Sequence, residues 1–464
     1  MKQFLYLKIY NDLKEKILKN YFADNKLPST RSLTKEYMVS SRTISKSVEL
    51  LERNGYINIV PSKGIYIKNN TKFKNNKKIK TILKNYKNTE IKTNKIIDFS
   101  KSEIDSSFFN KFLYQKLLKE IFSSEDFILN DFKYIQGLPS FINFISEWIE
   151  NDNIFVHKDN IFSISGTQQC LEIIMRAFYH DKKLNIAVSD PTHYNTITLL
   201  EPFSNIHGVH LLDDGWDFFD FENILNQYKI DFVYEAPNFQ NPSGISWSVE
   251  KKLYLLNLAN KYDFYIIEED NLSDFFYNIN KPITFKSLDK IGDERVFYIK
   301  DFSKIISNEL QVASLIVPTI FKEKISLEIV SLEASPSNIS QKIIELFIKN
   351  NHMNTFIKKY KKKLETRHNY ALYLLKKIPY LKIMHVPYGG FFIWLQLKTE
   401  IDEELFYTLC KMKGVLILPG YIFYQDRRKN SKFRICFLST DLEKIHTGIN
   451  IIKNILNKKK LRDL

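Results

Sequence analysis

Apolar residues near the N-terminus recur at the spacing of helices and then alternate as in strands. Three helices are predicted, and their apolar faces are Tyr6, Ile9, Leu13 and Ile17, then Leu33 and Tyr37, then Ile44, Val48 and Leu51. Serines in segment 27–33 and at Ser40 can cap the second and third helices. Gly55 ends the third helix, and two short strands flank a turn at 61–64. Residues 1–68 are therefore predicted to form a winged helix-turn-helix.

From Asp98 onward, short β-rich runs alternate with amphipathic helical stretches. This order is typical of an α/β domain with a mostly parallel sheet. We therefore expect a large body over residues 98–464, joined to the winged helix by a linker over residues 69–97 that is rich in lysine and asparagine.

Charge divides the chain at the same place. The whole surplus of +15 lies within residues 1–97, so the body is electrically balanced. A basic N-terminal part indicates nucleic acid or another anionic partner, although lysines in the linker are as well explained by simple solvation.

Cysteine usage and hydropathy exclude several classes of protein. The three cysteines are an odd number without CxxC spacing, which argues against a disulfide framework or a zinc site, so no metal is expected. No apolar run is long enough to span a membrane, and the N-terminal stretch is too short for a signal peptide. The chain is predicted to be cytoplasmic.

The N-terminal module resembles the GntR-type DNA-binding domain over residues 5–68. Its shared features are LPS-x-R at the second helix, Ser-x-x-Thr-Ile at the recognition helix and a glycine in the wing. The resemblance implies a duplex DNA operator, with the recognition helix in the major groove. The residues it places at DNA are Arg31, Ser41, Arg42, Thr43, Lys46, Lys63 and Gly64. The family usually has arginine at the position of Ser41, so base preference is expected to differ.

Candidate chemistry in the body lies where predicted strands end. A glycine turn at Gly166 opens a helix, which is an anion-binding arrangement. A carboxylate at Asp270 follows one strand, Lys304 follows the next, and Arg434 lies inside an apolar strand, where it needs an anionic partner.

In order and spacing, this set resembles the fold type I pyridoxal-phosphate enzymes of the class I aminotransferase family. The resemblance implies that Lys304 forms the internal aldimine, that Asp270 pairs with the pyridinium nitrogen, and that Asn241 binds the ring oxygen. Arg434 would bind a substrate carboxylate. The cofactor-binding set also includes Gly166, Thr167, Gln168, Ser303 and Tyr134 for the phosphate, and His193 and Tyr194 beside the ring. Tyr134 would act from a partner subunit, which implies a head-to-tail homodimer.

Four positions depart from the family pattern. Gln311 stands where an arginine usually meets the phosphate, and Asp301 stands where a serine or threonine usually donates to it. An aspartate carboxylate there would repel a dianion unless it is protonated or points elsewhere. Asn271 replaces an expected tyrosine, and His193 an expected stacking aromatic residue.

Together the two domains resemble a MocR-type transcriptional regulator. The resemblance implies a DNA-binding regulator whose aminotransferase-like domain senses pyridoxal phosphate or its aldimine with an amino compound. Two alternatives remain at this stage: a working aminotransferase, and a regulator whose domain has lost the cofactor.

Overall fold

The chain divides into two compact units, residues 1–94 and 95–464. The computed structural model describes residues 5–18, 22, 26–53, 56–60, 64–67, 96–103, 110–124, 134–290, 292–302, 304–398 and 403–457. Only the last two residues of the predicted linker, 96 and 97, fall within these ranges, and Ile97 already pairs as a strand of the body.

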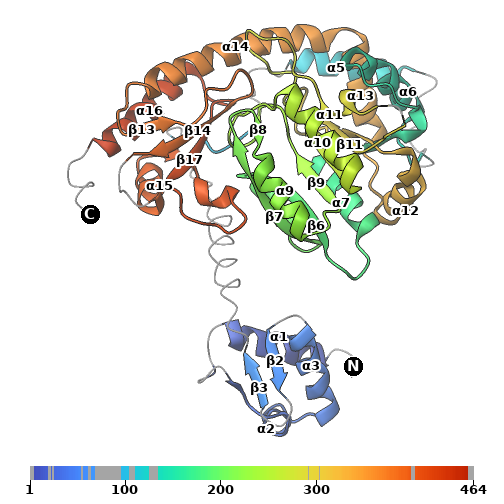
Figure 1. Cartoon of the computed structure of the whole chain (residues 1–464), viewed down its shortest axis with the longest axis vertical. Coiled ribbons are helices and arrows are strands. Elements are labelled where there is room, and N and C mark those ends of the chain that lie inside the picture. The colour runs from blue at the N-terminus through green and yellow to red at the C-terminus, as the bar shows by residue number, and fades with distance from the viewer. Residues whose placement is uncertain are drawn as a thin grey trace. The chain divides into compact units, whose positions relative to one another are not determined.

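The N-terminal unit has the predicted winged helix-turn-helix fold (Figure 1). Its elements are helices α1 (Leu5–Leu18), α2 (Thr30–Glu36) and α3 (Ser41–Arg53), and strands β1 (Lys26–Leu27), β2 (Ile57–Val60) and β3 (Gly64–Ile67). The strands form an antiparallel sheet in the order β1-β3-β2. Leu13, Leu33, Ile44, Leu51 and Ile57 are fully buried between helices and sheet, which confirms the apolar faces predicted for all three helices.

An eight-stranded sheet forms the centre of the large unit. Its strands, in spatial order, are β5 (Ile161–Ile164), β12 (Ala313–Ile316), β11 (Val296–Asp301), β10 (Tyr265–Asp270), β9 (Phe232–Glu235), β6 (Leu184–Asp190), β7 (Ser204–Leu212) and β8 (Gly215–Trp216). The five strands from β11 to β7 are parallel, whereas β12, β5 and β8 pair antiparallel. The sheet is therefore mostly parallel, as predicted.

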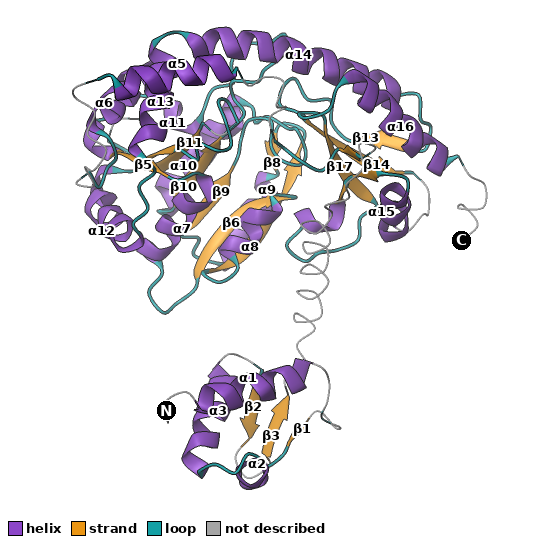
Figure 2. Ribbon diagram, turned by 180° about the vertical axis from the view of Figure 1, so that it is seen from behind, coloured by secondary structure: helices purple, strands orange, loops and turns teal. Residues whose placement is uncertain are grey.

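Helices cover both faces of this sheet (Figure 2). Adjacent residues of β10, Ile266 and Ile267, belong to two different apolar clusters, one on each face. This alternation is expected for a strand buried on both sides. The helices of this part are α5 (Lys111–Phe122), α6 (Pro139–Trp148), α7 (Thr167–Phe178), α8 (Tyr194–Leu200), α9 (Phe218–Gln227), α10 (Val249–Tyr262), α11 (Phe285–Leu288), α12 (Lys322–Leu332) and α13 (Asn338–Lys349).

A smaller antiparallel sheet follows along the chain. Its order is β13 (Leu381–Ile383), β14 (Phe392–Leu397), β17 (Lys432–Cys436) and β16 (Leu418–Pro419). The long helix α14 (His352–Leu375) runs past both sheets in Figure 1. The other helices of this C-terminal part are α15 (Glu403–Met412) and α16 (Leu442–Leu456). Strand β4 (Ile97–Asp98) pairs with β15 (Val415–Leu416), which ties the start of the unit to its C-terminal part.

Within the described ranges, no helix is both long and apolar enough to cross a bilayer.

Candidate functional site

The carboxyl ends of the parallel strands meet at a small cavity of about 190 Å³. Such an edge is where α/β sheets usually bind ligands. Four predicted site residues line the cavity, namely His193, Tyr194, Asn241 and Lys304. They follow three strands of the sheet: β6 leads to His193 and Tyr194 at the start of α8, β9 leads to Asn241, and β11 leads to Lys304.

Lys304 supplies an amine inside this cavity. Its Nζ donates a hydrogen bond to the carbonyl oxygen of Ser102, at 2.7 Å. Burial lowers the pKa of Lys304, and the nearby Asp301 carboxylate opposes that change. A lowered pKa makes the neutral, nucleophilic amine more accessible, as a carbonyl-binding lysine requires.

Arg434 belongs to strand β17 and lies beside Asn241. Its Nη1 donates to Asn241 Oδ1 at 2.8 Å, and its Nη2 donates to the Ser100 carbonyl oxygen at 2.6 Å. The guanidinium carbon lies 4.5 Å from the centre of the Phe392 ring. The side chain is only 2% exposed, so packing holds its charge in a defined orientation next to the cavity.

His193 begins helix α8, and Tyr194 follows it. The two rings make an edge contact, with 5.0 Å between their centres. Burial lowers the pKa of His193 to about 3, and the positive charges of Arg434 and Lys304 add to this effect. The imidazole is therefore neutral, and its flat face can pack against a ring. We call Lys304, Asn241, Arg434 and His193 the lysine end of the site.

The structure does not place Asp270 among the residues that line the cavity, and its pairing with a pyridinium nitrogen stays a prediction. Asp270 Oδ2 instead accepts hydrogen bonds from Lys300 Nζ at 3.0 Å, Tyr298 OH at 2.7 Å and Ser273 Oγ at 2.8 Å. Successive side chains of a strand point to opposite faces. Asp270 accordingly joins a buried ion-pair cluster with Lys300 and Asp274, away from the cavity lining.

Glu269 is the carboxylate that lines the cavity. It accepts hydrogen bonds from the Tyr234 hydroxyl and from Asn271 Nδ2. Burial raises its pKa to about 7, and the charge of Asp301 acts in the same direction. The sequence contains three consecutive acidic residues here, so only the register of β10 distinguishes which one faces the ligand.

The predicted anion-binding turn at the start of α7 already holds a carboxylate. Asp301 Oδ2 accepts from Thr167 Oγ1 at 2.9 Å and from the Thr167 backbone amide at 3.4 Å. Gly166 caps the helix with φ +89°, a conformation that favours glycine, and Gln168 is exposed. We call Gly166, Thr167, Gln168 and Asp301 the phosphate end of the site.

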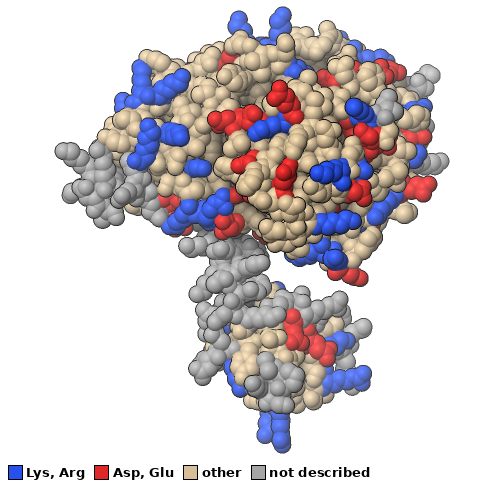
Figure 3. Space-filling model, viewed as in Figure 1, with Lys and Arg blue, Asp and Glu red and all other residues tan. Residues whose placement is uncertain are grey.

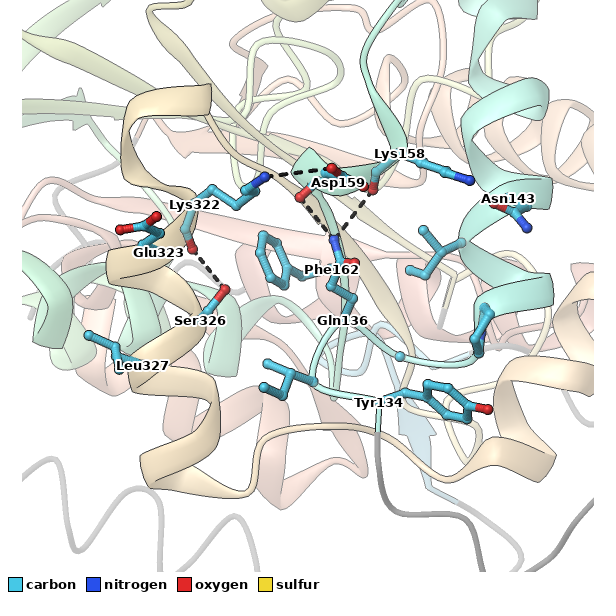
Figure 4. Close-up of a pocket in the computed structure, with 14 residues that line it drawn as sticks. Tyr134, Gln136, Asn143, Lys158, Asp159, Phe162, Lys322, Glu323, Ser326 and Leu327 are labelled. Carbon is cyan, nitrogen blue, oxygen red and sulfur yellow. Dashed lines mark hydrogen bonds and ion pairs between the residues drawn. The ribbon is translucent and has the colours of Figure 1, made fainter.

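Two other positions named from the sequence, Gln311 and Tyr134, are not among the residues that line this cavity. The predicted phosphate-binding residue Ser303 falls outside the residues that the structure describes. Gln311 is exposed, with φ +46°. Tyr134 is 39% exposed and lines a surface cavity of about 850 Å³ with Gln136, Phe162 and Ser326 (Figure 4). The role predicted for Tyr134, which is to contact the phosphate from a partner subunit, stays a prediction.

The N-terminal unit exposes most of its expected DNA contacts. Arg31 at the start of α2 and Ser41, Arg42 and Lys46 on α3 are exposed, whereas Thr43 is half-buried. Lysine and arginine side chains project over α2 and α3 in Figure 3.

Capping and ring contacts define the geometry of these helices. Ser29 caps α2 by accepting from the Ser32 amide at 3.2 Å. The Lys46 ammonium lies 4.5 Å from the centre of the Tyr6 ring. Gly64 has φ +121° at the start of β3, and Lys63 lies outside the described residues.

The two ends of the body's site fit the implied pyridoxal phosphate unequally. The lysine end presents an amine and an amide in one cavity, with a guanidinium bound to that amide, which suits an aromatic aldehyde with polar substituents. The phosphate end does not fit as it stands, because the Thr167 donors at the helix terminus are already bound to Asp301.

Comparison with known proteins agrees with this two-part architecture. Residues 96–452 match the family described as aminotransferase class I and II, and residues 5–67 match bacterial regulatory proteins of the gntR family. The HTH-type transcriptional regulator NorG of Staphylococcus aureus (strain USA300) is 26% identical over 453 residues, covering 91% of this chain and 99% of NorG. The uncharacterized HTH-type transcriptional regulator YdfD of Bacillus subtilis (strain 168) is 23% identical, covering 96% and 94%.

Solved aminotransferase structures are similar to this chain over most of its length. Pyrococcus horikoshii kynurenine aminotransferase, in complex with PMP, superposes with a TM-score of 0.74 at 25% identity, covering 82% of this chain and 95% of that one. An archaeal alanine:glyoxylate aminotransferase gives a TM-score of 0.76 at 21% identity, with the same two coverages.

Proposed function

The chain belongs to the aminotransferase class I and II family and is a GntR-type transcriptional regulator, and we propose that its aminotransferase-like domain binds the effector. The effector is either pyridoxal phosphate itself or the product of its condensation with an amino compound. The observation that carries this proposal is the Lys304 amine, which lies in a cavity that Asn241 also lines, in a chain that also exposes basic residues on its recognition helix.

Each side chain of the lysine end has a distinct task. Lys304 supplies the amine that recognises a carbonyl group, and burial favours its uncharged form. Asn241 and Arg434 supply polar contacts at the rim, and the neutral His193 supplies a flat face. Pyridoxal phosphate, when bound, contributes an electron-withdrawing ring that activates an amino compound.

The regulator acts on double-stranded DNA as a head-to-tail homodimer in the cytoplasm. Two winged helices then meet two half-sites, whose spacing the dimer sets. A bound effector changes operator affinity by favouring one arrangement of the dimer over another.

The DNA-binding part is tested by selecting bound fragments from a random duplex pool and measuring affinity against salt. Arg31→Ala and Arg42→Ala should each weaken binding and lower the salt slope, because each removes a phosphate or base contact. Glu49→Ala, at an exposed acidic position of the same helix α3, is the matched control. Unchanged binding by both arginine variants contradicts the assignment.

The effector part is tested by repeating the titration with pyridoxal phosphate and a mixture of amines. A shift in operator affinity that disappears in Lys304→Ala supports the proposal, and a shift that persists in this variant contradicts it. A working aminotransferase is the second candidate, because Lys304, Asn241 and Arg434 are all present. Keto acid formed from an amino donor, at a rate that depends on Lys304, would favour that candidate.

A further inference from the structure

The start of helix α7 is bound by a carboxylate of the chain itself. Asp301 and Thr167 are 8% and 7% exposed, and both the hydroxyl and the amide of Thr167 donate to the same Asp301 oxygen. Gly166, at the cap position, has no side chain that could take this place. Asp301 therefore performs for α7 the role that a capping side chain usually performs.

Asp301 also stands next to the effector cavity. It is the last residue of β11, three positions before Lys304. Its negative charge affects two residues that line the cavity. It raises the pKa of Lys304, against the effect of burial, and it raises the pKa of Glu269. A second anion bound at the start of α7 would lie close to this buried carboxylate. Two negative charges that lie close together in a buried site repel each other strongly.

We propose that Asp301 occupies the place of the ligand's phosphate group, so that the site recognises a pyridoxal-type aldehyde by its ring and carbonyl and gains no affinity from the phosphate. This inference rests on the proposed function and deepens it. A ligand without an anchored phosphate exchanges freely, so the occupancy of the site follows the free concentration of the ligand. Asp301 thereby makes the ligand a reversible effector instead of a resident cofactor.

The test compares pyridoxal with pyridoxal 5′-phosphate, and because free pyridoxal largely closes to an internal hemiacetal, each affinity is expressed per open-chain aldehyde. Each ligand is titrated into the full chain, and binding is read from the visible absorbance that depends on Lys304. The main variant is Asp301→Ser, which removes the charge and much of the bulk and supplies a hydroxyl, a group that commonly caps helices. Asp301→Asn removes the charge alone, and thermal unfolding shows that each variant is folded.

A matched control exists elsewhere in the body. Asp217 caps helix α9 by accepting from the Phe219 amide, so Asp217→Ser removes the same charge from the start of another helix. It should leave both affinities unchanged.

The wild-type chain should bind the two ligands within about threefold of each other. Asp301→Ser should tighten pyridoxal phosphate by about tenfold or more and change pyridoxal by less than about twofold. Wild type that binds pyridoxal phosphate at least tenfold more tightly than pyridoxal, with no gain in Asp301→Ser or Asp301→Asn, would overturn the inference while leaving the proposed function standing.

The opposite pattern separates the two claims. If wild type binds neither ligand and Asp301→Ser binds pyridoxal phosphate, the inference holds and the proposed effector is wrong. If neither ligand binds to any folded variant, both are overturned.

Discussion

The two ends of the body's site are built on the same sheet edge but have opposite relations to a ligand. At the lysine end, Lys304 and Asn241 face a cavity and retain the chemistry that the aminotransferase resemblance implies. At the phosphate end, the helix terminus is satisfied from within the chain by Asp301. One part of the site is open to a small molecule, and the other is closed by a side chain.

This difference separates recognition from retention. An amine in a cavity can recognise a carbonyl group reversibly, whereas a phosphate bound by backbone amides and an arginine holds a cofactor in place. A regulator that reports on a concentration needs the first property and is weakened by the second, since a ligand that is never released carries no information. The geometry at Asp301 is therefore better suited to sensing than to turnover.

The largest effect is expected when the lysine end is removed. Lys304→Ala deletes the amine that recognises the carbonyl, so binding of pyridoxal and of pyridoxal phosphate should fall below detection in a visible absorbance titration. The fold should remain, because the change truncates a side chain whose hydrogen bond in the described part of the chain is to one backbone carbonyl. An unchanged absorbance band would place the reactive amine elsewhere.

The phosphate end can instead be strengthened. Gln311→Arg introduces the cation that the aminotransferase resemblance implies, and it should tighten pyridoxal phosphate by about tenfold while leaving pyridoxal unchanged. The left-handed conformation at Gln311 is already adopted by a residue with a long side chain, so the substitution adds little strain. Equal affinities in variant and wild type would show that position 311 does not reach the phosphate.

A smaller effect concerns the carboxylate between the two ends. The pKa of Glu269 is raised from 4.5 to about 7, so the folded chain binds a proton that the unfolded chain has released. The free energy of unfolding should therefore fall as the pH rises through this window and level off above it.

Glu269→Gln should reduce this fall in the free energy of unfolding by an amount on the order of 1 kcal/mol. The slope persists in part because burial also raises the pKa of Glu235 to about 7. Urea unfolding of the two proteins at pH 5 and pH 8 measures the difference, and identical pH profiles would mean that Glu269 is not protonated in the folded chain.

Much of this arrangement follows from local sequence patterns. The winged helix is encoded by helical periodicity and by serine caps, both of which act over a few residues, and the body is encoded by alternating strand and helix patterns. Lys304 and Asn241 follow β-rich runs, whose ends gather at one edge of a sheet, while their roles are implied by the resemblance to class I aminotransferases.

Local patterns say less where the arrangement depends on strand register or on distant contacts. Asp270 and Glu269 are equally acidic neighbours, and only the pairing of β10 decides which one meets the cavity. The sequence marks Asp301 as unfavourable for a phosphate but gives no sign that it binds Thr167, which is 134 positions away. Side-chain partners at that separation follow from the packed sheet and are invisible to local patterns.

The difference between the two ends is tested most directly by competition at equal concentrations of open-chain aldehyde, since free pyridoxal largely closes to an internal hemiacetal. Wild-type protein is mixed with pyridoxal and pyridoxal 5′-phosphate together and reduced with borohydride, and the masses of the modified peptides are then measured. We predict comparable amounts of both adducts, each located on Lys304. A peptide that carries the phosphorylated adduct almost exclusively would contradict the account, because it would show that the phosphate is bound despite Asp301.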